Sequence, residues 1–545
     1  MSRVTGPLAR IIPTGVLAKS SFCSTLKSLK SNGSSHGFTA IVWGDSNDIC
    51  ITSCGGNTDW LNSFGATLDR RLCQVSGLHP SDRPTYQAVW VPATQAVGTT
   101  YSNMPTTNSP MNSAFWSSSG FAYVAGPLPG YVGSPSSCYA ITTSNSGTRY
   151  LRYLLDQRNS GNSPLPWQRN KVKFCISIWY GAKDTDTPLT ITTNTGNTFA
   201  STPTSTPASD VNGYATTVNV QVRDFSGPTI IAGSTQNIDC RLPTGNAWQA
   251  LSGVFTPWNT HLYGPSGTAQ QYIEVEVPNT ANTMCAFGGI LLDDGTSGGV
   301  RIIDLAYSGG AYGGRALEDR AIDGSISFAT AGGALAGMGQ RYMPALGSWI
   351  GEDWADRVES FWTRLVGAST GATRKATFQS LGVSQTPPYS TIDALFLNLF
   401  KNDYDNGPDS QSQYIARMTE IISRFVAKNP AGLVFVTIRP GGGGTISTRD
   451  DPYTNASYSV SGTTKGLRSS WVSAVDALVG TFPANVARLD VDLLFQGNKA
   501  TDQVRKFQNF GTANGADLVN FDPLHFKPFV NQMIADTWGD LIDAA

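Results

Sequence analysis

The chain has 545 residues, of which 40% are hydrophobic and 10% aromatic, a composition that supports packed cores and differs from that of disordered chains. Lys and Arg total 38 against 39 Asp and Glu, so a formal net charge of -1 leaves no bulk electrostatic footprint for nucleic acid or an anionic membrane. The length exceeds that of one ordinary core and predicts two or three domains.

Residues 1–37 are interpreted as an N-terminal extension that attaches or links the chain. Pro13 and Gly15 interrupt the apolar character of this segment, which is not typical of a signal peptide. No stretch of the chain approaches the ~20 consecutive apolar residues of a membrane span, so we expect no membrane insertion. All eight cysteines lie between Cys23 and Cys285 without a CxxC pattern, and we expect buried free thiols rather than disulfides.

Residues 38–84 read as a strand, a turn and a helix. The run "FTAIVWG" is continuously apolar and predicts a buried strand, which ends in the polar residues Asp45, Ser46, Asn47 and Asp48. The run "NTDWLNSFGATLDRRL" that follows has helical spacing, with Asn57 or Thr58 as a plausible cap.

Residues 85–299 have a different pattern. Short β-rich runs such as "KVKFCISIWYG", "YATTVNVQV" and "QYIEVEVP" alternate with clusters of Gly, Pro, Ser, Thr and Asn. This alternation predicts an all-β sandwich, jelly-roll-like, inserted at a loop of the surrounding domain. A carbohydrate-binding role is a hypothesis for this region, because tryptophans can stack on sugars, although a buried core is their commoner position; they are Trp116, Trp167, Trp179, Trp248 and Trp258.

Residues 300–545 return to alternating strands and helices. The runs "VRIIDLAY", "IDALFLNLF", "GLVFVTIRP" and "VARLDVDLLF" predict buried strands. Helical patterns follow them, among them "SQSQYIARMTEIISRFVA", "SSWVSAVDALVG" and "KPFVNQMIADTWGDLIDA". The alternation predicts a three-layer α/β/α domain with a parallel sheet, to which residues 38–84 supply the first strand and helix.

Ligands of an open parallel sheet bind beyond the carboxyl ends of its strands, so the residues there are the candidates for a site. Ser46 follows the first strand, Gly309 the second and Asn402 the third, while Asp522 and His525 precede the last helix. A serine hydroxyl, an imidazole base, a carboxylate and donors for an oxyanion are the parts of an acyl-transfer site. Asp45 and Asp48 are expected to brace the turn rather than to react.

These blocks, "GDSN", a glycine, "ND" and "DPLH" in this order, resemble the SGNH (GDSL-type) hydrolase superfamily. The resemblance covers 38–82 and 300–545. It implies Ser46 as the nucleophile and Asp522 and His525 as the rest of the triad. It also implies the N–H groups of Ser46 and Gly309 and the side chain of Asn402 as the oxyanion hole. It implies no metal and no organic cofactor.

The third block departs from the family pattern, because Phe400 stands where a glycine is usual. A bulky ring there could narrow the pocket, which keeps open an inactive scaffold in a structural or receptor-binding protein. A lipolytic GDSL-type esterase is the other alternative. Loops rich in acidic residues at 183–187, 292–299 and 447–454 lack the EF-hand spacing and are interpreted as solvated turns, and the glycine-rich run 439–445 as a flexible loop near the mouth of the site.

The function expected from the sequence is therefore an esterase that removes O-acetyl or similar acyl groups from a surface polysaccharide. A virion-like composition without a signal peptide suggests a phage tail or fibre component, in the virion or outside the cell, by analogy. In that case residues 1–37 would dock onto other virion proteins, and a fibre would be a trimer.

Overall fold

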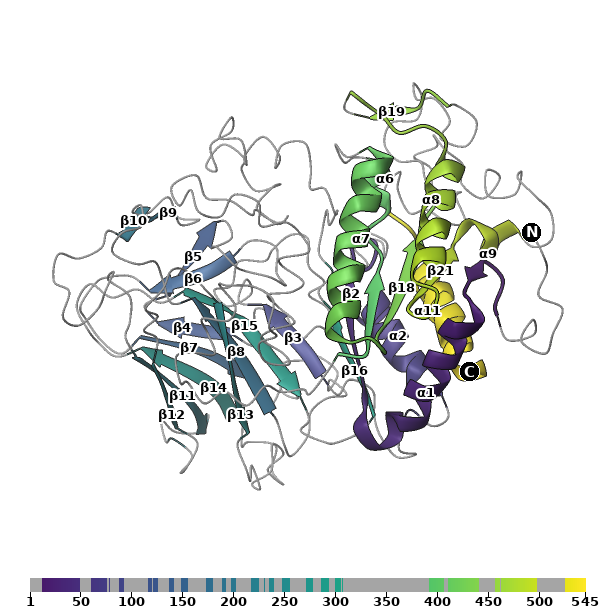
Figure 1. Ribbon diagram of the computed structural model, residues 1–545. Coiled ribbons are helices and arrows are strands. Elements are labelled where there is room, and N and C mark those ends of the chain that lie inside the picture. Colours follow the sequence, from purple (N-terminus) through teal and green to yellow (C-terminus); the bar gives the residue numbers. More distant parts are fainter. Residues whose placement is uncertain are drawn as a thin grey trace.

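The fold is that of a computed structural model (Figure 1). It describes the following residues: 12–49, 60–75, 78, 299–304, 306, 392–405, 410–440, 456–460, 462–496 and 525–545, together with the strands between residues 88 and 293 and residues 230 and 235.

The centre of the α/β part is a six-stranded sheet with the order β1-β21-β18-β17-β2-β16. Five neighbouring strands run parallel, and only the short edge strand β1 pairs antiparallel, with β21. The apolar runs in the sequence form these strands because both faces of the sheet are covered by helices. The strands are β1 (Val16–Leu17), β2 (Phe38–Trp43), β16 (Val300–Asp304), β17 (Ala394–Leu397), β18 (Leu433–Ile438) and β21 (Val486–Asp490).

The order of the parallel strands places a switch point between β2 and β17. Numbered along the chain, β2, β16, β17, β18 and β21 are strands one to five, and their order across the sheet is 2-1-3-4-5. From β2 the chain continues to β16 on one side, whereas β17 on the other side leads away toward β21. Connections that diverge in this way leave a crevice at the carboxyl ends of the two strands, where ligands of open α/β sheets bind.

Helices cover the two faces of the sheet and make it the middle of three layers. Alternate residues of β2 point to opposite faces: Ala40 and Val42 belong to one buried cluster, and Ile41 and Trp43 to the other. The first cluster packs under α1 (Ser20–His36), α2 (Phe64–Leu72) and α11 (Pro528–Ala544). The second packs under α7 (Gln411–Lys428) and α8 (Arg468–Thr481). The parallel sheet and the mixed α/β class predicted from the sequence are confirmed.

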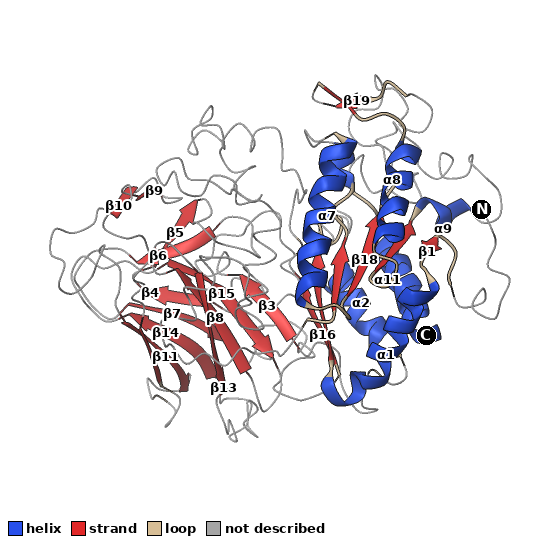
Figure 2. Ribbon diagram, viewed as in Figure 1, coloured by secondary structure: helices blue, strands red, loops and turns tan. Residues whose placement is uncertain are grey.

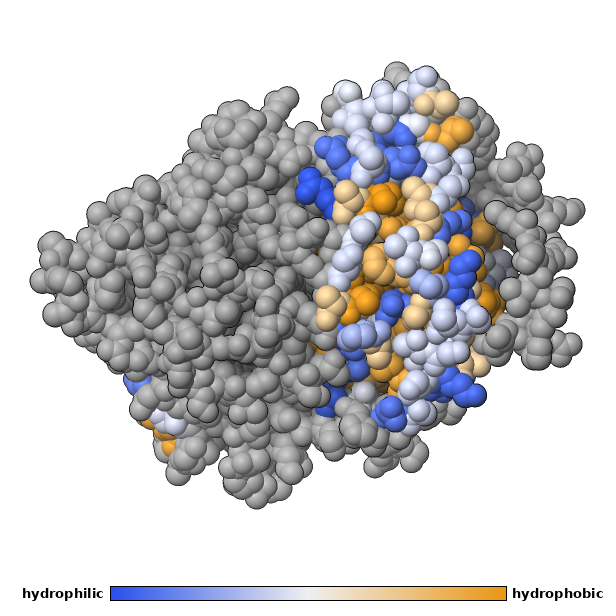
Figure 3. All heavy atoms as spheres, in the orientation of Figure 1, coloured by the Kyte–Doolittle hydropathy of each residue, from blue (hydrophilic) through white to orange (hydrophobic). Residues whose placement is uncertain are grey.

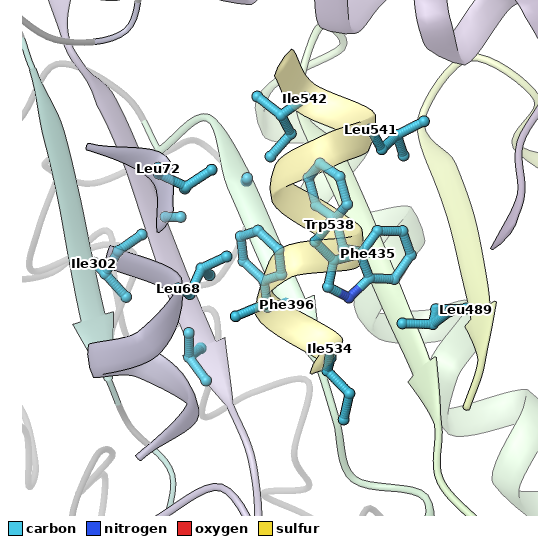
Figure 4. Close-up of a cluster of buried hydrophobic side chains, with 14 of the residues drawn as sticks. Leu68, Leu72, Ile302, Phe396, Phe435, Leu489, Ile534, Trp538, Leu541 and Ile542 are labelled. Atoms are coloured by element: carbon cyan, nitrogen blue, oxygen red, sulfur yellow. The ribbon is translucent and has the colours of Figure 1, made fainter. Parts of the chain in front are cut away.

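Large aromatic side chains hold α11 against the sheet (Figure 4). Trp538 is fully buried and meets the Phe435 ring edge-on at 5.1 Å between centroids, and Phe435 stacks on Phe396 at 4.5 Å. The Trp538 indole N–H donates to the Thr437 hydroxyl at 3.1 Å. The helix that follows His525 is thereby held firmly on the strands. On the opposite face, Figure 3 shows hydrophobic residues between hydrophilic ones where α7 and α8 lie.

Two local predictions need correction. The helix after the first strand starts later than expected: a 3-10 turn, η2 (Trp60–Asn62), precedes α2, whose N-cap is Ser63, with its hydroxyl accepting from the Ala66 N–H at 3.2 Å. The run "VARLDVDLLF" is a strand only to Asp490, and α9 (Asp492–Gln496) follows, because the Asp490 carboxylate accepts the Asp492 N–H and turns the chain. The remaining short elements are α6 (Lys401–Asp405), β19 (Ser459–Val460) and β20 (Thr463–Thr464).

Part of the N-terminal segment belongs to the α/β domain. β1 pairs with β21 through Val16 and Leu17, and Phe22 and Leu26 of α1 are buried in the cluster under α11. Gly15, at a φ of 84°, takes a backbone conformation that favours glycine, and its carbonyl accepts the Asp490 N–H at 2.9 Å. From residue 12 onward, the segment expected to be an extension thus adds an edge strand and a helix.

Between β2 and β16 the chain forms antiparallel sheets, apart from the parallel one (Figure 2). One has the order β12-β11-β14-β7-β4, another the order β13-β8-β15-β6-β5 with β3 beside β15, and β9 pairs with β10. Trp116 is buried beside Tyr153, as expected for a core tryptophan. The strands are β3 (Ala88–Pro92), β4 (Trp116–Ser119), β5 (Phe121–Ala125), β6 (Ser137–Ile141), β7 (Arg149–Leu154), β8 (Lys173–Trp179), β9 (Leu189–Thr192), β10 (Thr198–Ser201), β11 (Thr217–Asp224), β12 (Gln236–Asp239), β13 (Trp248–Val254), β14 (Gln271–Val277) and β15 (Ala286–Asp293).

Candidate active site

The loop after β2, residues 44–49, is a tight turn held by its own carboxylates. The Asp45 carboxylate accepts the Asn47 N–H at 2.8 Å, and the Asp45 carbonyl accepts the N–H groups of Asp48 and Ile49 at 3.0 and 3.3 Å. The Asp48 carboxylate turns back to accept the Asp45 N–H at 2.9 Å. Asp45 and Asp48 therefore brace the turn, as the sequence predicts.

Gly44 is required by this fold-back. A Cβ at position 44 would lie 2.3 Å from Oδ2 of Asp48, closer than any real contact. The glycine that precedes "DSN" therefore serves the close approach of the Asp48 side chain, not a special backbone angle.

Ser46 and His525 lie within hydrogen-bond distance. His525 Nε2 is 3.1 Å from Ser46 Oγ, although the two residues are 479 positions apart in the chain. Among the described residues, the Ser46 N–H donates to no acceptor. A hydroxyl in contact with an imidazole, beside an unused backbone donor, is the arrangement in which an attacking serine can lose its proton while an oxyanion is stabilised.

Asn47 connects the loop that carries Ser46 to the segment that carries His525. Its side-chain oxygen accepts the N–H of Phe526, the residue after His525, at 2.9 Å. Its carbonyl accepts from the side-chain amide of Asn531 on α11 at 2.8 Å. These two bonds join the loop to the residue after His525 and to the first turn of α11.

The Asp48 carboxylate is fully buried and has donors from two further strand ends. Its Oδ1 accepts from Asn398 Nδ2, just after β17, at 2.8 Å and from Arg439 Nη2, just after β18, at 2.5 Å. Asp48 and Arg439 both have 0% exposure. The residues following three neighbouring strands thus converge on one carboxylate behind the turn that carries Ser46.

Burial dominates the titration of the acidic groups behind the turn. It raises the pKa of Asp48 to about 6, although the Arg439 guanidinium acts to lower it, and the Asp45 carboxylate raises it further. Burial also raises the pKa of Asp304, the last residue of β16, to about 7; the N–H groups of Ala306 and Gly65 oppose that rise, and the Asp48 carboxylate adds to it. These carboxyls hold protons more tightly than exposed ones.

Asn402 lies in α6, which follows β17, and β17 pairs with β2 from Ala394–Ala40 to Leu397–Trp43. It is buried and stands at the same sheet edge as Ser46, across the switch point. Phe400, which the sequence suggests could narrow the pocket, instead has its ring in the core under α7 and α8. It stacks on Tyr404 and meets Trp471 edge-on, at 5.5 and 6.1 Å between centroids.

Gly309 and Asp522 lie outside the described residues, so their roles stay predictions. The acidic loops at 183–187, 292–299 and 447–454 also lie outside, apart from the last two residues of β15 and Gly299. Among the residues that the structure describes, no cluster of three or more His, Cys, Asp or Glu side chains could hold a metal ion. In the same residues no helix is long and apolar enough to cross a membrane, and Cys23 and Cys73 are free thiols.

Sequence reasoning missed Arg439, Asn398 and Asn531. Arg439 is fully buried, whereas the glycine-rich run 439–445 is interpreted from the sequence as a flexible loop. A signal was present: Arg439 and Asn398 are polar residues directly after apolar runs, in "LVFVTIRP" and "ALFLN". What the pattern could not show is that they point at the same carboxylate.

No family model matches the chain, and no curated protein does. Among solved structures, a peptidoglycan O-acetylesterase is 12% identical over 96% of this chain and 97% of its own, with a TM-score of 0.44. A family two carbohydrate esterase from Clostridium thermocellum is 9% identical over 77% of this chain and 97% of its own, with a TM-score of 0.22. At these identities and TM-scores the likeness does not establish what this chain does.

Proposed function

We propose that this chain is a serine esterase of the SGNH type, with Ser46 as the nucleophile and His525 as the base. The observation that carries the proposal is the 3.1 Å contact between His525 Nε2 and Ser46 Oγ at the switch point of a parallel sheet. A serine that served only the turn would not need an imidazole beside it, and a histidine that served only the packing would not need the hydroxyl of this carboxylate-braced loop. Together they form the reacting pair of an acyl transfer.

In the proposed reaction His525 Nε2 accepts the Ser46 proton as Oγ attacks the ester carbonyl carbon. The negative charge moves to the carbonyl oxygen, which the Ser46 N–H stabilises, together with the Asn402 side chain and the Gly309 N–H that the sequence predicts. The imidazolium returns the proton to the leaving alcohol, and an acyl-enzyme forms on Ser46. Water, deprotonated by His525, then releases the acid. Asp522 is the carboxylate proposed to orient His525.

The proposed substrate is an O-acetyl or similar small acyl ester on a polysaccharide. The strands between β2 and β16 support it, since antiparallel sheets inserted between the first two strands of the α/β domain suit a separate sandwich that binds glycan. The virion location remains a proposal that depends on composition alone. The reaction needs no metal or organic cofactor.

The test is hydrolysis of p-nitrophenyl acetate by the full chain. We expect turnover by the wild type and a loss of at least ~10³-fold in Ser46→Ala and His525→Ala. Ser473→Ala is the matched control, since that serine is exposed on α8, and it should retain full activity. Release of acetate from an acetylated polysaccharide would then test the substrate class.

Two outcomes would contradict the proposal. Equal inactivity of wild type and Ser46→Ala would favour the scaffold reading. A strong preference for octanoyl over acetyl esters would favour a lipolytic enzyme.

A further inference from the structure

Arg439 lies where the nucleophile loop, the end of β18 and the start of α11 meet. Its Nη2 donates to Asp48 Oδ1 at 2.5 Å and to Asn531 Oδ1 at 3.3 Å. Asp48 belongs to the turn that presents Ser46, and Asn531 lies six residues after His525 on the helix that follows it. One side chain therefore bonds to both of the segments that carry the reacting pair.

The contacts beyond Arg439 strengthen this connection. Asn531 accepts from Arg439 through Oδ1, and its Nδ2 donates to the Asn47 carbonyl at 2.8 Å and to the Asn62 carbonyl at 3.3 Å. The guanidinium carbon of Arg439 lies 5.8 Å from the centre of the Phe526 ring. Asn531 is 3% exposed and Phe526 also 3%, so these contacts are shielded from water.

Packing alone does not account for an arginine at this position. Arg439 is fully buried, and within the part of the chain that the structure describes its Nε and Nη1 have no hydrogen-bond partner. A buried ion pair is expensive to desolvate, and each unsatisfied buried donor costs about 1–3 kcal/mol. An apolar side chain of similar volume, with a neutral residue at position 48, would fill the same space at lower free energy. What an apolar side chain could not supply is the pair of hydrogen bonds to Asp48 and Asn531.

We propose that Arg439 is a positioning residue, which holds the Ser46 turn and the His525 segment in register by bonding to Asp48 and Asn531 at once. It touches none of the reacting atoms. This inference rests on the proposed function, since it assigns Arg439 a part in the same acyl transfer. A shift of about 1 Å between nucleophile and base can cost about 10²-fold in rate, so loss of this link should lower kcat.

The experiment compares four variants of the full chain. Arg439→Met removes the link, and Arg439→Lys keeps a charge beside Asp48 but not the fork that also reaches Asn531. The double variant Asp48→Asn with Arg439→Met removes both charges, so no buried charge is left unpaired. We therefore expect it to fold even if Arg439→Met alone does not. Arg488→Met is the matched control, because it breaks a half-buried ion pair with Asp476 between β21 and α8 and leaves the turn untouched.

Two readouts are measured on protein shown to be folded by circular dichroism. The first is the rate of covalent labelling of Ser46 by an alkyl fluorophosphonate, followed by intact mass. The second is kcat and KM for p-nitrophenyl acetate. We expect labelling and kcat to fall about 10–100-fold in Arg439→Met and in the double variant. We expect a smaller fall in Arg439→Lys, KM within about threefold throughout, and no change in Arg488→Met.

The inference is overturned if folded Arg439 variants label and turn over as fast as the wild type, or if Arg488→Met loses as much as Arg439→Met. A wild type that labels at Ser46 but hydrolyses no ester would refute the proposed esterase, while the labelling series would still decide the role of Arg439. A wild type that does not label would overturn both.

Discussion

Two buried arginines at the carboxyl edge of the sheet differ in how well their charges are compensated. Arg468, the first residue of α8, lies 2.7 Å from the carboxylates of both Asp490 and Asp492, and it also donates to the carbonyls of Ile438 and Arg439. Arg439 bonds to one carboxylate and one amide oxygen, and its Nε and Nη1 find no partner among the described residues. The better compensated arginine, Arg468, bonds to the residues that follow β21, whereas Arg439 bonds to the turn that carries Ser46.

The comparison suggests that the two arginines have different purposes. An arginine that is compensated by two carboxylates mainly joins elements, here the end of β21, α9 and the start of α8. A poorly compensated one is retained at a cost in stability, and sites of function are where such costs are found. If that difference is real, replacing Arg468 should mainly lower stability and replacing Arg439 should mainly lower activity.

Arg468→Met should be the most destabilising change, by about 3–5 kcal/mol, because it leaves Asp490 and Asp492 buried without their cation. Urea unfolding followed by tryptophan fluorescence measures it. The protein that remains folded should lose less esterase activity than Arg439→Met. If kcat fell as far in folded Arg468→Met as in Arg439→Met, the two arginines would not differ in purpose.

Gly44→Ala should destabilise the protein by about 1–3 kcal/mol and lower activity strongly, since the new Cβ would displace the Asp48 side chain from Arg439. Gly480→Ala is the matched control. Nothing lies within 4 Å of a Cβ at that helical position, so it should stabilise by up to about 1 kcal/mol. Urea unfolding curves and p-nitrophenyl acetate turnover of both variants measure the changes in stability and in activity. A Gly44→Ala protein as stable and as active as the wild type would contradict the fold-back of Asp48.

The buried acids should make the protein less stable as the pH rises. The pKa of Asp304 is raised to about 7, above its value of about 4 in the unfolded chain, so the folded state holds a proton that the unfolded state has lost. From this group alone, the free energy of unfolding should fall by about 1.4 kcal/mol per pH unit between pH 4 and 7.

Asp304→Asn, which mimics the protonated side chain, should flatten that slope. The remainder should come from Asp48 and Asp393, whose pKa values burial raises to about 6. Urea unfolding at pH 5 and pH 7.5 compares the two proteins. An unchanged slope in the variant would show that Asp304 titrates as an exposed acid does.

Phe400→Leu should have the smallest effect, a loss of about 1 kcal/mol from reduced aromatic packing against Tyr404, Tyr414 and Trp471. Since the ring lies in the core, the preference for acetyl over longer acyl esters should not change. Relative kcat/KM for acetyl, butyryl and octanoyl esters measures this. Broader acyl tolerance in the variant would mean that the ring limits the pocket.

Much of the α/β domain could be predicted because its strands are continuous apolar runs and its helices have clear periodicity. The helix over 411–428 even carries its start signal, with a capping box between Ser410 and Gln413. The helix over 20–36 was not predicted, since it is rich in Ser and Lys and buries only a few apolar residues such as Phe22 and Leu26. Its stability comes from the sheet that it covers, which local sequence does not show.

For the site, the residue order alone shows which chemical groups are available: a serine after the first strand, a histidine before the last helix and polar residues at the intervening strand ends. Motif order suffices for that, because strand ends in a parallel sheet share an edge. The distance from His525 to Ser46, the burial of the Phe400 ring in the core, and the contacts of Arg439, Asn398 and Asn531 behind the turn follow from the packing of the folded chain. Those contacts depend on the strand order and on how α11 packs, which are set by burial of surfaces hundreds of residues apart.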